Sequence, residues 1–202
     1  DDAPDAEGPP HRAMMQALIV NARRGGLAEV ILEVIDENAR AHTLYRDLGF
    51  ADVRELLTWR LAADADPLPI PQELLSEVAP ESVIPHFDDW HRERPCWQRE
   101  LPTLRRMMGR ARAYSLALDG RPAAYCLIAE RVDSISILDA GINPDFGAIR
   151  AGRPLLQALS RLHPNRPLTM MNVSADDPLC RALAALRFHV TIRQWEMMLR
   201  PQ

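Results

Sequence analysis

The sequence carries one structural pattern twice. Residues 28–61 and residues 166–199 each read as a strand, a helix and a closing strand or hairpin, and a helical pattern precedes each of them. Phe188 lies 138 residues after Phe50, and at this offset many apolar positions of the two segments coincide. Any two strand–helix–strand segments look alike in outline, but here the order and the lengths agree over four consecutive elements. We therefore expect a duplicated unit, and this expectation constrains the fold more than any other feature.

The two copies differ in what precedes them. Before the second copy we expect helices at 72–78 and within 86–108, the latter interrupted at Pro95, and strands at 113–118, 123–129 and 135–140. Asp119 and Gly120 mark a hairpin between the first two of these strands. Comparable strands are missing before the first copy, so we expect a trimmed or truncated start.

A linker rich in Pro and Asp, residues 62–71, lies between the two copies. The predicted fold class is α/β with a mixed, α+β-like sheet, built as one partial and one nearly complete unit in tandem. The predicted domains are residues 1–66, the C-terminal half of a first unit, and residues 67–202, a second and degenerate unit.

The composition excludes several classes of protein. Hydrophobic residues make up 47% of the chain and no long apolar run occurs, which predicts a soluble globular protein that does not span a membrane. The formal net charge of -4 offers no basic surface for nucleic acid. The 3 cysteines are widely spaced and the histidines lack the spacing of metal ligands, so we expect no disulfide framework and no metal. A reducing cytoplasm fits this cysteine usage.

Residues 38–50 read as an amphipathic helix with both ends marked. Asn38 or Asp36 can cap its N-terminus by accepting a backbone N–H. Gly49 can adopt the left-handed conformation that ends a helix, and Phe50 can then fold back onto the apolar face. The members of that face are Ala41, Leu44, Tyr45 and Leu48. The one group that this structural interpretation leaves unexplained is the hydroxyl of Tyr45.

The same region resembles the C-terminal signature of the GCN5-related N-acetyltransferases. The matching residues are Val30, Leu32, Val34, Asn38, Ala41, Leu44, Tyr45, Leu48, Gly49 and Phe50. The two-copy arrangement is similar to that of tandem members of this family. The resemblance implies an acyl-CoA N-acyltransferase-like fold, acetyl-CoA as cosubstrate, and a small-molecule or peptide amine as acceptor. A homodimer is left open.

The resemblance also implies roles for individual residues. Tyr45 would donate a proton to the departing thiolate of coenzyme A, and Asn38 would hydrogen-bond the pantetheine arm. The alternative for Tyr45 is a core aromatic residue whose hydroxyl reaches the surface. The alternative for the whole protein is a non-catalytic module that binds a ligand or partner with this fold.

The cofactor loop of the family is poorly matched in both copies. The family holds the pyrophosphate of coenzyme A on the backbone N–H groups of a glycine-rich turn that opens a helix. In the first copy Gly8 stands near this position, but Pro9 and Pro10 each lack an N–H. Arg12 could offer compensating positive charge, although a solvated residue in the first turn of the helix is the simpler interpretation. In the second copy Gly147 and Gly152 remain in a pattern that is spread and offset, and Arg153 is the corresponding cation.

The second copy also lacks the chemistry of the first. Leu183 stands at the position of Tyr45, Asp176 at that of Asn38, and Arg187 at that of Gly49. We therefore expect the second unit to complete the architecture or to shape the acceptor pocket.

The remaining candidate residues also have purely structural interpretations. Glu33 and Glu196 could each serve as a general base for the acceptor amine, but a carboxylate at the rim of a strand is the simpler interpretation. Gly141 is predicted to mark a bulge where the family's central strand splays. Core packing is predicted for three tryptophans, Trp90, Trp97 and Trp195.

Overall fold

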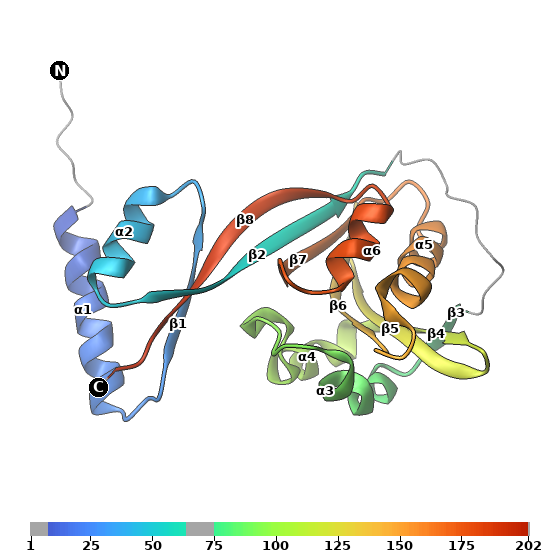
Figure 1. Ribbon diagram of the computed structural model, residues 1–202, viewed down its shortest axis with the longest axis horizontal. Coiled ribbons are helices and arrows are strands. Elements are labelled where there is room, and N and C mark those ends of the chain that lie inside the picture. Colours follow the sequence, from blue (N-terminus) through green and yellow to red (C-terminus); the bar gives the residue numbers. More distant parts are fainter. Residues whose placement is uncertain (1–7, 64–74, 202) are drawn as a thin grey trace, which may run out of the picture. The chain divides into compact units, whose positions relative to one another are not determined.

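The computed structural model describes residues 8–63 and 75–201. Its strands form one mixed sheet of 8 strands in the order β1-β8-β2-β7-β6-β5-β4-β3 (Figure 1). The predicted mixed α/β fold class is confirmed. The elements up to residue 63 are α1 (Gly8–Arg24), β1 (Val30–Ile35), α2 (Ala39–Asp47) and β2 (Ala51–Leu61).

Two further groups of elements follow in sequence. The first group is β3 (Leu75–Val78), η1 (Pro80–His86), α3 (Phe87–Trp90), η2 (Trp97–Arg99), α4 (Leu101–Met107), η3 (Met108–Arg110), β4 (Arg112–Leu118), β5 (Arg121–Glu130) and β6 (Ile135–Ile142). The second group is the π-helical turn η4 (Ala148–Gly152), α5 (Arg153–Leu162), β7 (Leu168–Ser174), α6 (Leu179–Ala185) and β8 (His189–Leu199). The predicted strands that correspond to β4, β5, β6, β7 and β8 are thus confirmed.

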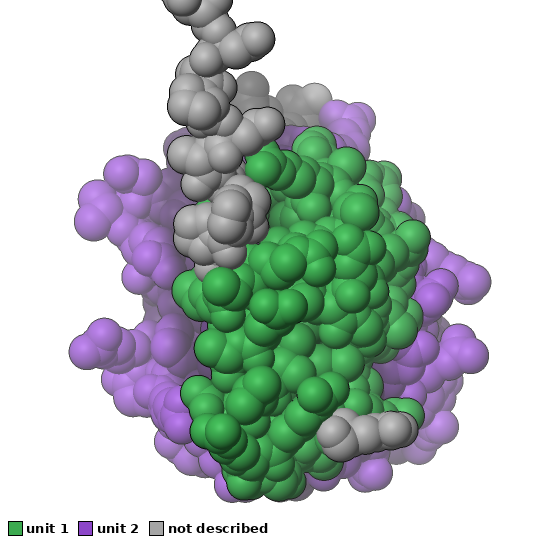
Figure 2. All heavy atoms as spheres, turned by 90° about the vertical axis from the view of Figure 1, so that its left-hand side faces the viewer, with its two compact units in different colours: residues 1–56, 193–202 green, residues 57–192 purple. Residues whose placement is uncertain are grey.

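The chain divides into two compact units (Figure 2). Unit 1 comprises residues 1–56 with 193–202, and unit 2 comprises residues 57–192. Strands β2 and β8 contribute residues to both units, so unit 1 combines segments from the two ends of the sequence. The predicted boundary between residues 66 and 67 lies outside the described residues.

Unit 1 is built on the antiparallel pair β1 and β8, in a register that places Val30 opposite Leu199 and Ile35 opposite Gln194. Since side chains alternate along a strand, one face of this pair is apolar and packs with α1 and α2. The buried residues of this core are Ile19, Val34, Phe50 and Met197. The core therefore fixes α2, which carries Tyr45, against the sheet.

Both predicted ends of the Tyr45 helix are confirmed. The side chain of Asn38 accepts a hydrogen bond from the backbone N–H of Ala41 at 3.1 Å, as an N-cap does. Gly49 has φ 95°, in the left-handed region that an L side chain disfavours. Phe50 is buried and meets the ring of Tyr45 edge to face, with ring centroids 6.0 Å apart.

Unit 2 has a sheet covered on both faces. Alternate residues of β4, β5 and β6 pack with α5 and α6 in the larger core, which includes Leu116, Cys126 and Leu156. The residues between them face the opposite side, where Tyr125 and Leu127 pack with Val83, Phe87 and Leu104 of the helical segment. The sheet of unit 2 is therefore the middle of three layers.

The same order of elements occurs twice, as α1-β1-α2-β2 and as α5-β7-α6-β8. In the sheet, β8 lies beside β1 and β2 lies beside β7. Each closing strand is thus adjacent to the first strand of the other four-element segment. That two copies of one unit stand in tandem is our interpretation of this order.

Three sequence-based predictions are wrong in detail. The helix predicted at 72–78 is a strand where it is described, because β3 pairs with β4 from Leu75 opposite Leu116 to Val78 opposite Ala113. Tertiary pairing overrides the local pattern here. Trp97 does not pack in the core, since it is 55% exposed.

The third error concerns Gly141. The register between β5 and β6 shifts before Gly141 is reached, since Leu127 pairs with Asp139 whereas Ile128 pairs with Ile137. Gly141 itself pairs regularly with Tyr125. A Cβ at Gly141 would lie 2.3 Å from Cε1 of Tyr125, so this glycine permits the close approach of the tyrosine ring.

We expect Gly141→Ala to destabilise the protein by about 1–3 kcal/mol, because the ring of Tyr125 is buried and cannot retreat from the new methyl group. Urea denaturation measures the effect. Gly109→Ala is the matched control, since nothing lies within 4 Å of a Cβ at that exposed position. Equal stability of the two variants would contradict the packing role of Gly141.

Candidate functional site

A groove between α1 and α2 of unit 1 brings together three of the residues predicted to form the site. Arg12 from α1 and Asn38 and Tyr45 from α2 all line it, and its volume is about 540 Å³. Met15 and Leu44 add apolar surface to the same groove. The groove thus combines a cation, an amide and a phenol on an apolar floor.

The local fold explains how Tyr45 reaches the groove. Its ring packs on the core of unit 1 and meets Phe50 edge to face, while the residue as a whole is half-buried. Asn38 lies at the N-terminal end of the same helix, where its side-chain oxygen is used in capping and its amide nitrogen is left for other contacts. Helix α2 therefore presents two polar side chains to one groove from a fixed backbone.

Arg12 is engaged in an ion pair. Its guanidinium lies 2.9 Å from a carboxylate oxygen of Asp47, and the two side chains are 42% and 54% exposed. Such exposed pairs contribute little to stability, so an anion in the groove can compete for the guanidinium. Gly8 is the first residue of α1, and the predicted cofactor contact there stays a prediction.

Unit 2 has a cavity at the place where β6 and β7 separate. The two strands pair in parallel only from Ile135 opposite Leu168 to Ile137 opposite Met170, although both continue further. The cavity has a volume of about 330 Å³ and is lined by the end of β6, by η4 and by the start of α6. Trp90 and His91 form part of its wall.

The positions that correspond to the unit 1 site carry no equivalent chemistry in unit 2. Leu183, the counterpart of Tyr45, is fully buried in the core. Arg187, the counterpart of Gly49, adopts a left-handed φ of 63° and ends α6 as Gly49 ends α2. A Cβ at Gly152 would lie 2.5 Å from Cδ1 of Ile142, so this glycine serves the packing of the helix start on β6.

A buried polar cluster lies beside this cavity, centred on Asp139 of β6. Oδ1 of Asp139 lies 3.1 Å from Nε2 of His91 and accepts from Nη2 of Arg99 at 2.9 Å. Oδ2 accepts from the hydroxyl of Tyr125 at 2.8 Å. Asp139 is completely buried, and it is satisfied by donors from the residue after α3, from η2 and from β5.

The electrostatics of the cluster keep its carboxylate charged. Burial alone would raise the pKa of Asp139, but the charges of His91 and Arg99 lower it to about 2. Sequence reasoning did not assemble this cluster. Its signal was the single charged residue of β6, which indicates a buried charge that requires partners.

The fold of the chain is similar to that of several solved structures. No protein-family model and no curated protein matches it. A GCN5-related N-acetyltransferase from Sphaerobacter thermophilus aligns with a TM-score of 0.66 at 14% identity, over 94% of this chain and 67% of that one. A GCN5-related N-acetyltransferase from Anabaena variabilis gives 0.63 at 14% identity, over 98% of this chain and 52% of that one. The chain has the fold of the GCN5-related N-acetyltransferases.

The likeness extends to a protein of unknown function. A functionally unknown conserved protein from Staphylococcus epidermidis aligns with a TM-score of 0.68 at 10% identity, over 96% of this chain and 82% of that one. The chain spans about half the length of the Anabaena protein. The resemblance to GCN5-related N-acetyltransferases inferred from residues 30–50 is thus confirmed at the level of the fold.

Within residues 8–63 and 75–201, no group of three or more His, Cys, Asp or Glu side chains is arranged to hold a metal ion. None of the helices in the described part of the chain combines the length and apolarity needed to cross a membrane.

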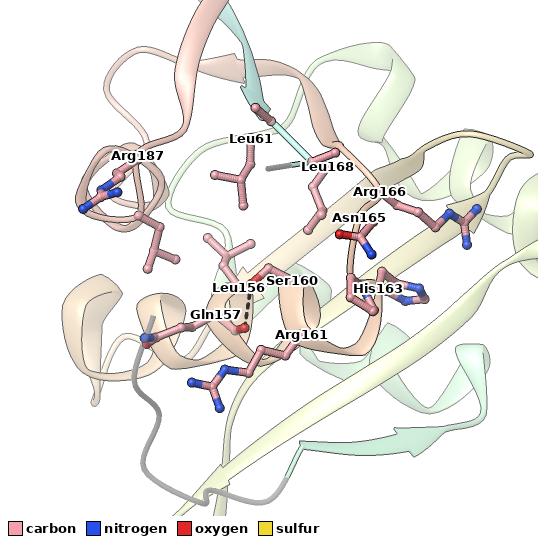
Figure 3. A pocket seen from close by; sticks show the side chains of 14 residues that line it. Leu61, Leu156, Gln157, Ser160, Arg161, His163, Asn165, Arg166, Leu168 and Arg187 are labelled. Carbon is pink, nitrogen blue, oxygen red and sulfur yellow. Dashed lines mark hydrogen bonds between the residues drawn. The ribbon is translucent and has the colours of Figure 1, made fainter. Parts of the chain in front are cut away.

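A further cavity of about 530 Å³ lies in unit 2, at the C-terminal end of α5 (Figure 3). Leu61, Leu156 and Leu168 point toward one another across it. His163 contributes to its lining, and burial lowers the pKa of this imidazole. None of the residues predicted for catalysis or cofactor binding lines this cavity. The proposed chemistry therefore does not involve it.

We expect Asp139→Asn to destabilise the protein by about 3–5 kcal/mol, because it leaves the buried charge of Arg99 without its counter-ion. Urea denaturation at neutral pH measures this loss. Asp145→Asn is the control, since Asp145 is exposed and lies 3.6 Å from its partner Arg121, and it should change stability by less than about 0.5 kcal/mol. Similar stabilities of both variants would show that the cluster does not hold unit 2 together.

Proposed function

We propose that this protein is a cytoplasmic N-acetyltransferase that transfers an acetyl group from acetyl-CoA to a primary amine in the groove of unit 1. The observation that carries this proposal is the convergence of Arg12, Asn38 and Tyr45 from two helices on one groove. The GCN5-related N-acetyltransferase fold supports it. The acceptor is a small-molecule or peptide amine.

The reaction requires an acid for the leaving group. The amine nitrogen attacks the thioester carbonyl carbon, a C–N bond forms, and the C–S bond of the tetrahedral intermediate breaks. Thiols have a pKa of about 8.5 and phenols of about 10, so a phenol can share its proton with the departing thiolate. In this mechanism Tyr45 donates the proton to sulfur, and the amine gives its own proton to solvent.

The other residues of the groove bind and orient acetyl-CoA. The amide nitrogen of Asn38 donates to a carbonyl of the pantetheine arm, while its oxygen continues to cap α2. Arg12 exchanges Asp47 for the pyrophosphate of coenzyme A, whose two phosphates together carry more charge than the one carboxylate. The start of α1 at Gly8 adds the positive end of a helix dipole, weakened by the two prolines that lack N–H groups.

A second candidate function is ligand or partner binding without transfer. The observation that favours it is the engagement of Arg12 by Asp47, together with Pro9 and Pro10 where the family has a glycine-rich turn. The same fold hosts both activities, so binding and transfer must be measured separately.

Acetyl-CoA binding should stabilise the protein by about 2.7 kcal/mol at one hundred times the dissociation constant, and thus raise its melting temperature. Arg12→Gln should weaken binding about tenfold, since it removes a charge-assisted hydrogen bond. Asp47→Asn is the matched control, because it releases the same guanidinium from its ion pair and should strengthen binding. If millimolar acetyl-CoA leaves the melting temperature of the folded protein unchanged, the groove does not bind this cosubstrate.

Tyr45→Phe keeps the ring and its contact with Phe50 and removes only the hydroxyl. We expect the rate of thiol release with a panel of primary amines to fall by about 10²–10⁴, with acetyl-CoA affinity nearly unchanged. Tyr114→Phe removes a hydroxyl from the core of unit 2 and should leave the rate as it is. Leu183→Tyr should add no activity. A Tyr45→Phe variant as fast as the wild type would exclude Tyr45 as the acid.

A further inference from the structure

We propose that His91 is a pH-operated latch on the cavity of unit 2. In its protonated form it holds the segment after α3 against β6, and its deprotonation releases this wall of the cavity. The latch is independent of the transfer chemistry proposed for unit 1.

The hydrogen bonds of His91 require protons on both ring nitrogens. Nδ1 lies 2.8 Å from the backbone oxygen of Phe87, and a carbonyl oxygen can only accept. Nε2 lies 3.1 Å from Oδ1 of Asp139, a carboxylate that also accepts from buried Arg99 and is therefore ionised. Both nitrogens must donate, so the ring is an imidazolium in this geometry.

Neutral His91 does not fit the same geometry. Loss of either proton turns a donating nitrogen into a lone pair that faces an oxygen at hydrogen-bond distance. The His91 side chain is only 5% exposed, so bulk water does not screen this repulsion. The neutral ring must therefore move away from Phe87 or from Asp139.

The charged surroundings of His91 set the direction of the effect. Burial alone would lower the pKa of His91, but the adjacent charge of Asp139 raises it above its ordinary value of 6.5. The segments packed with His91 carry further titratable or charged groups. These are Asp88 and Asp89 on α3, Arg92, which lines the cavity with His91, Arg99 of η2, Tyr125 of β5, whose ring centroid lies 6.5 Å from that of His91, and Asp177, which acts on Arg99. The stabilisation is therefore complete below pH 6.5 and is lost as pH rises through the higher pKa of the folded state.

Movement of His91 changes the cavity because His91 is part of the cavity wall. His91 and Trp90 line the cavity together with Ala140, which follows Asp139 in β6. Trp90 stacks on Tyr125 with ring centroids 5.7 Å apart, and the hydroxyl of Tyr125 donates to Asp139. One carboxylate thus anchors the two aromatic side chains of the cavity wall, and loss of its His91 contact loosens that wall.

Hydrogen exchange of the whole protein, followed by mass spectrometry and corrected for the intrinsic rate at each pH, tests the latch. Protection of residues 87–99 should stay constant up to about pH 6.5, then fall by up to about tenfold per pH unit until the pKa of folded His91 is passed. Protection of α5 serves as the internal reference and should stay constant. Protection of residues 87–99 that does not change up to about pH 9 would overturn the proposal.

Two variants distinguish a pH-dependent role of His91 from a purely structural role. His91→Gln can donate to Asp139 at every pH, so the fall in protection above pH 6.5 should disappear. His163→Gln removes another buried histidine of unit 2, one whose pKa is lowered, and should keep the fall. A fall that persists in His91→Gln would overturn the proposal. Should this variant not fold, NMR titration of the His91 ring in the wild type decides, and a midpoint below 6.5 would overturn the latch.

Discussion

The fold depends on an exchange of closing strands between its two four-element segments. Each of these strands closes one four-element segment, and in the sheet each lies beside the first strand of the other segment, β8 beside β1 and β2 beside β7. Both strands also contribute residues to both compact units. Main-chain hydrogen bonds between strands far apart in the sequence therefore complete each unit, and the last residues of the chain are needed to form the core that supports Tyr45.

In unit 2 a single buried carboxylate has a comparable role. A charged group without water is costly, so Asp139 requires all of its donors, and these come from His91, Arg99 and Tyr125. The requirement ties the helical segment to one face of the sheet beside the separation of β6 and β7. It also places a titratable ring in the wall of the adjacent cavity, which couples packing to proton concentration.

The two four-element segments show how one fold carries different chemistry. At corresponding places, α2 presents Tyr45 to a groove, whereas α6 buries Leu183 in the core. Helix ends are similar in both, since Gly49 and Arg187 each adopt a left-handed conformation. The order of elements is therefore shared, and the side chains at a few positions decide whether a helix face lines a groove or packs in the core.

The sequence by itself determined what depends on neighbouring residues. It predicted the order of strands and helices in the two four-element segments, the cap at Asn38, the helix end at Gly49 and the contact of Phe50 with Tyr45, because periodicity and backbone preferences act over a few residues. Only the tertiary structure decided what depends on distant partners. It made residues 75–78 a strand by pairing them with β4, and it set the exchange of the closing strands. It also brought to Asp139 of β6 its donors from β5, from η2 and from the residue after α3, because long-range hydrogen bonds and buried charges leave no local pattern from which their partners can be read.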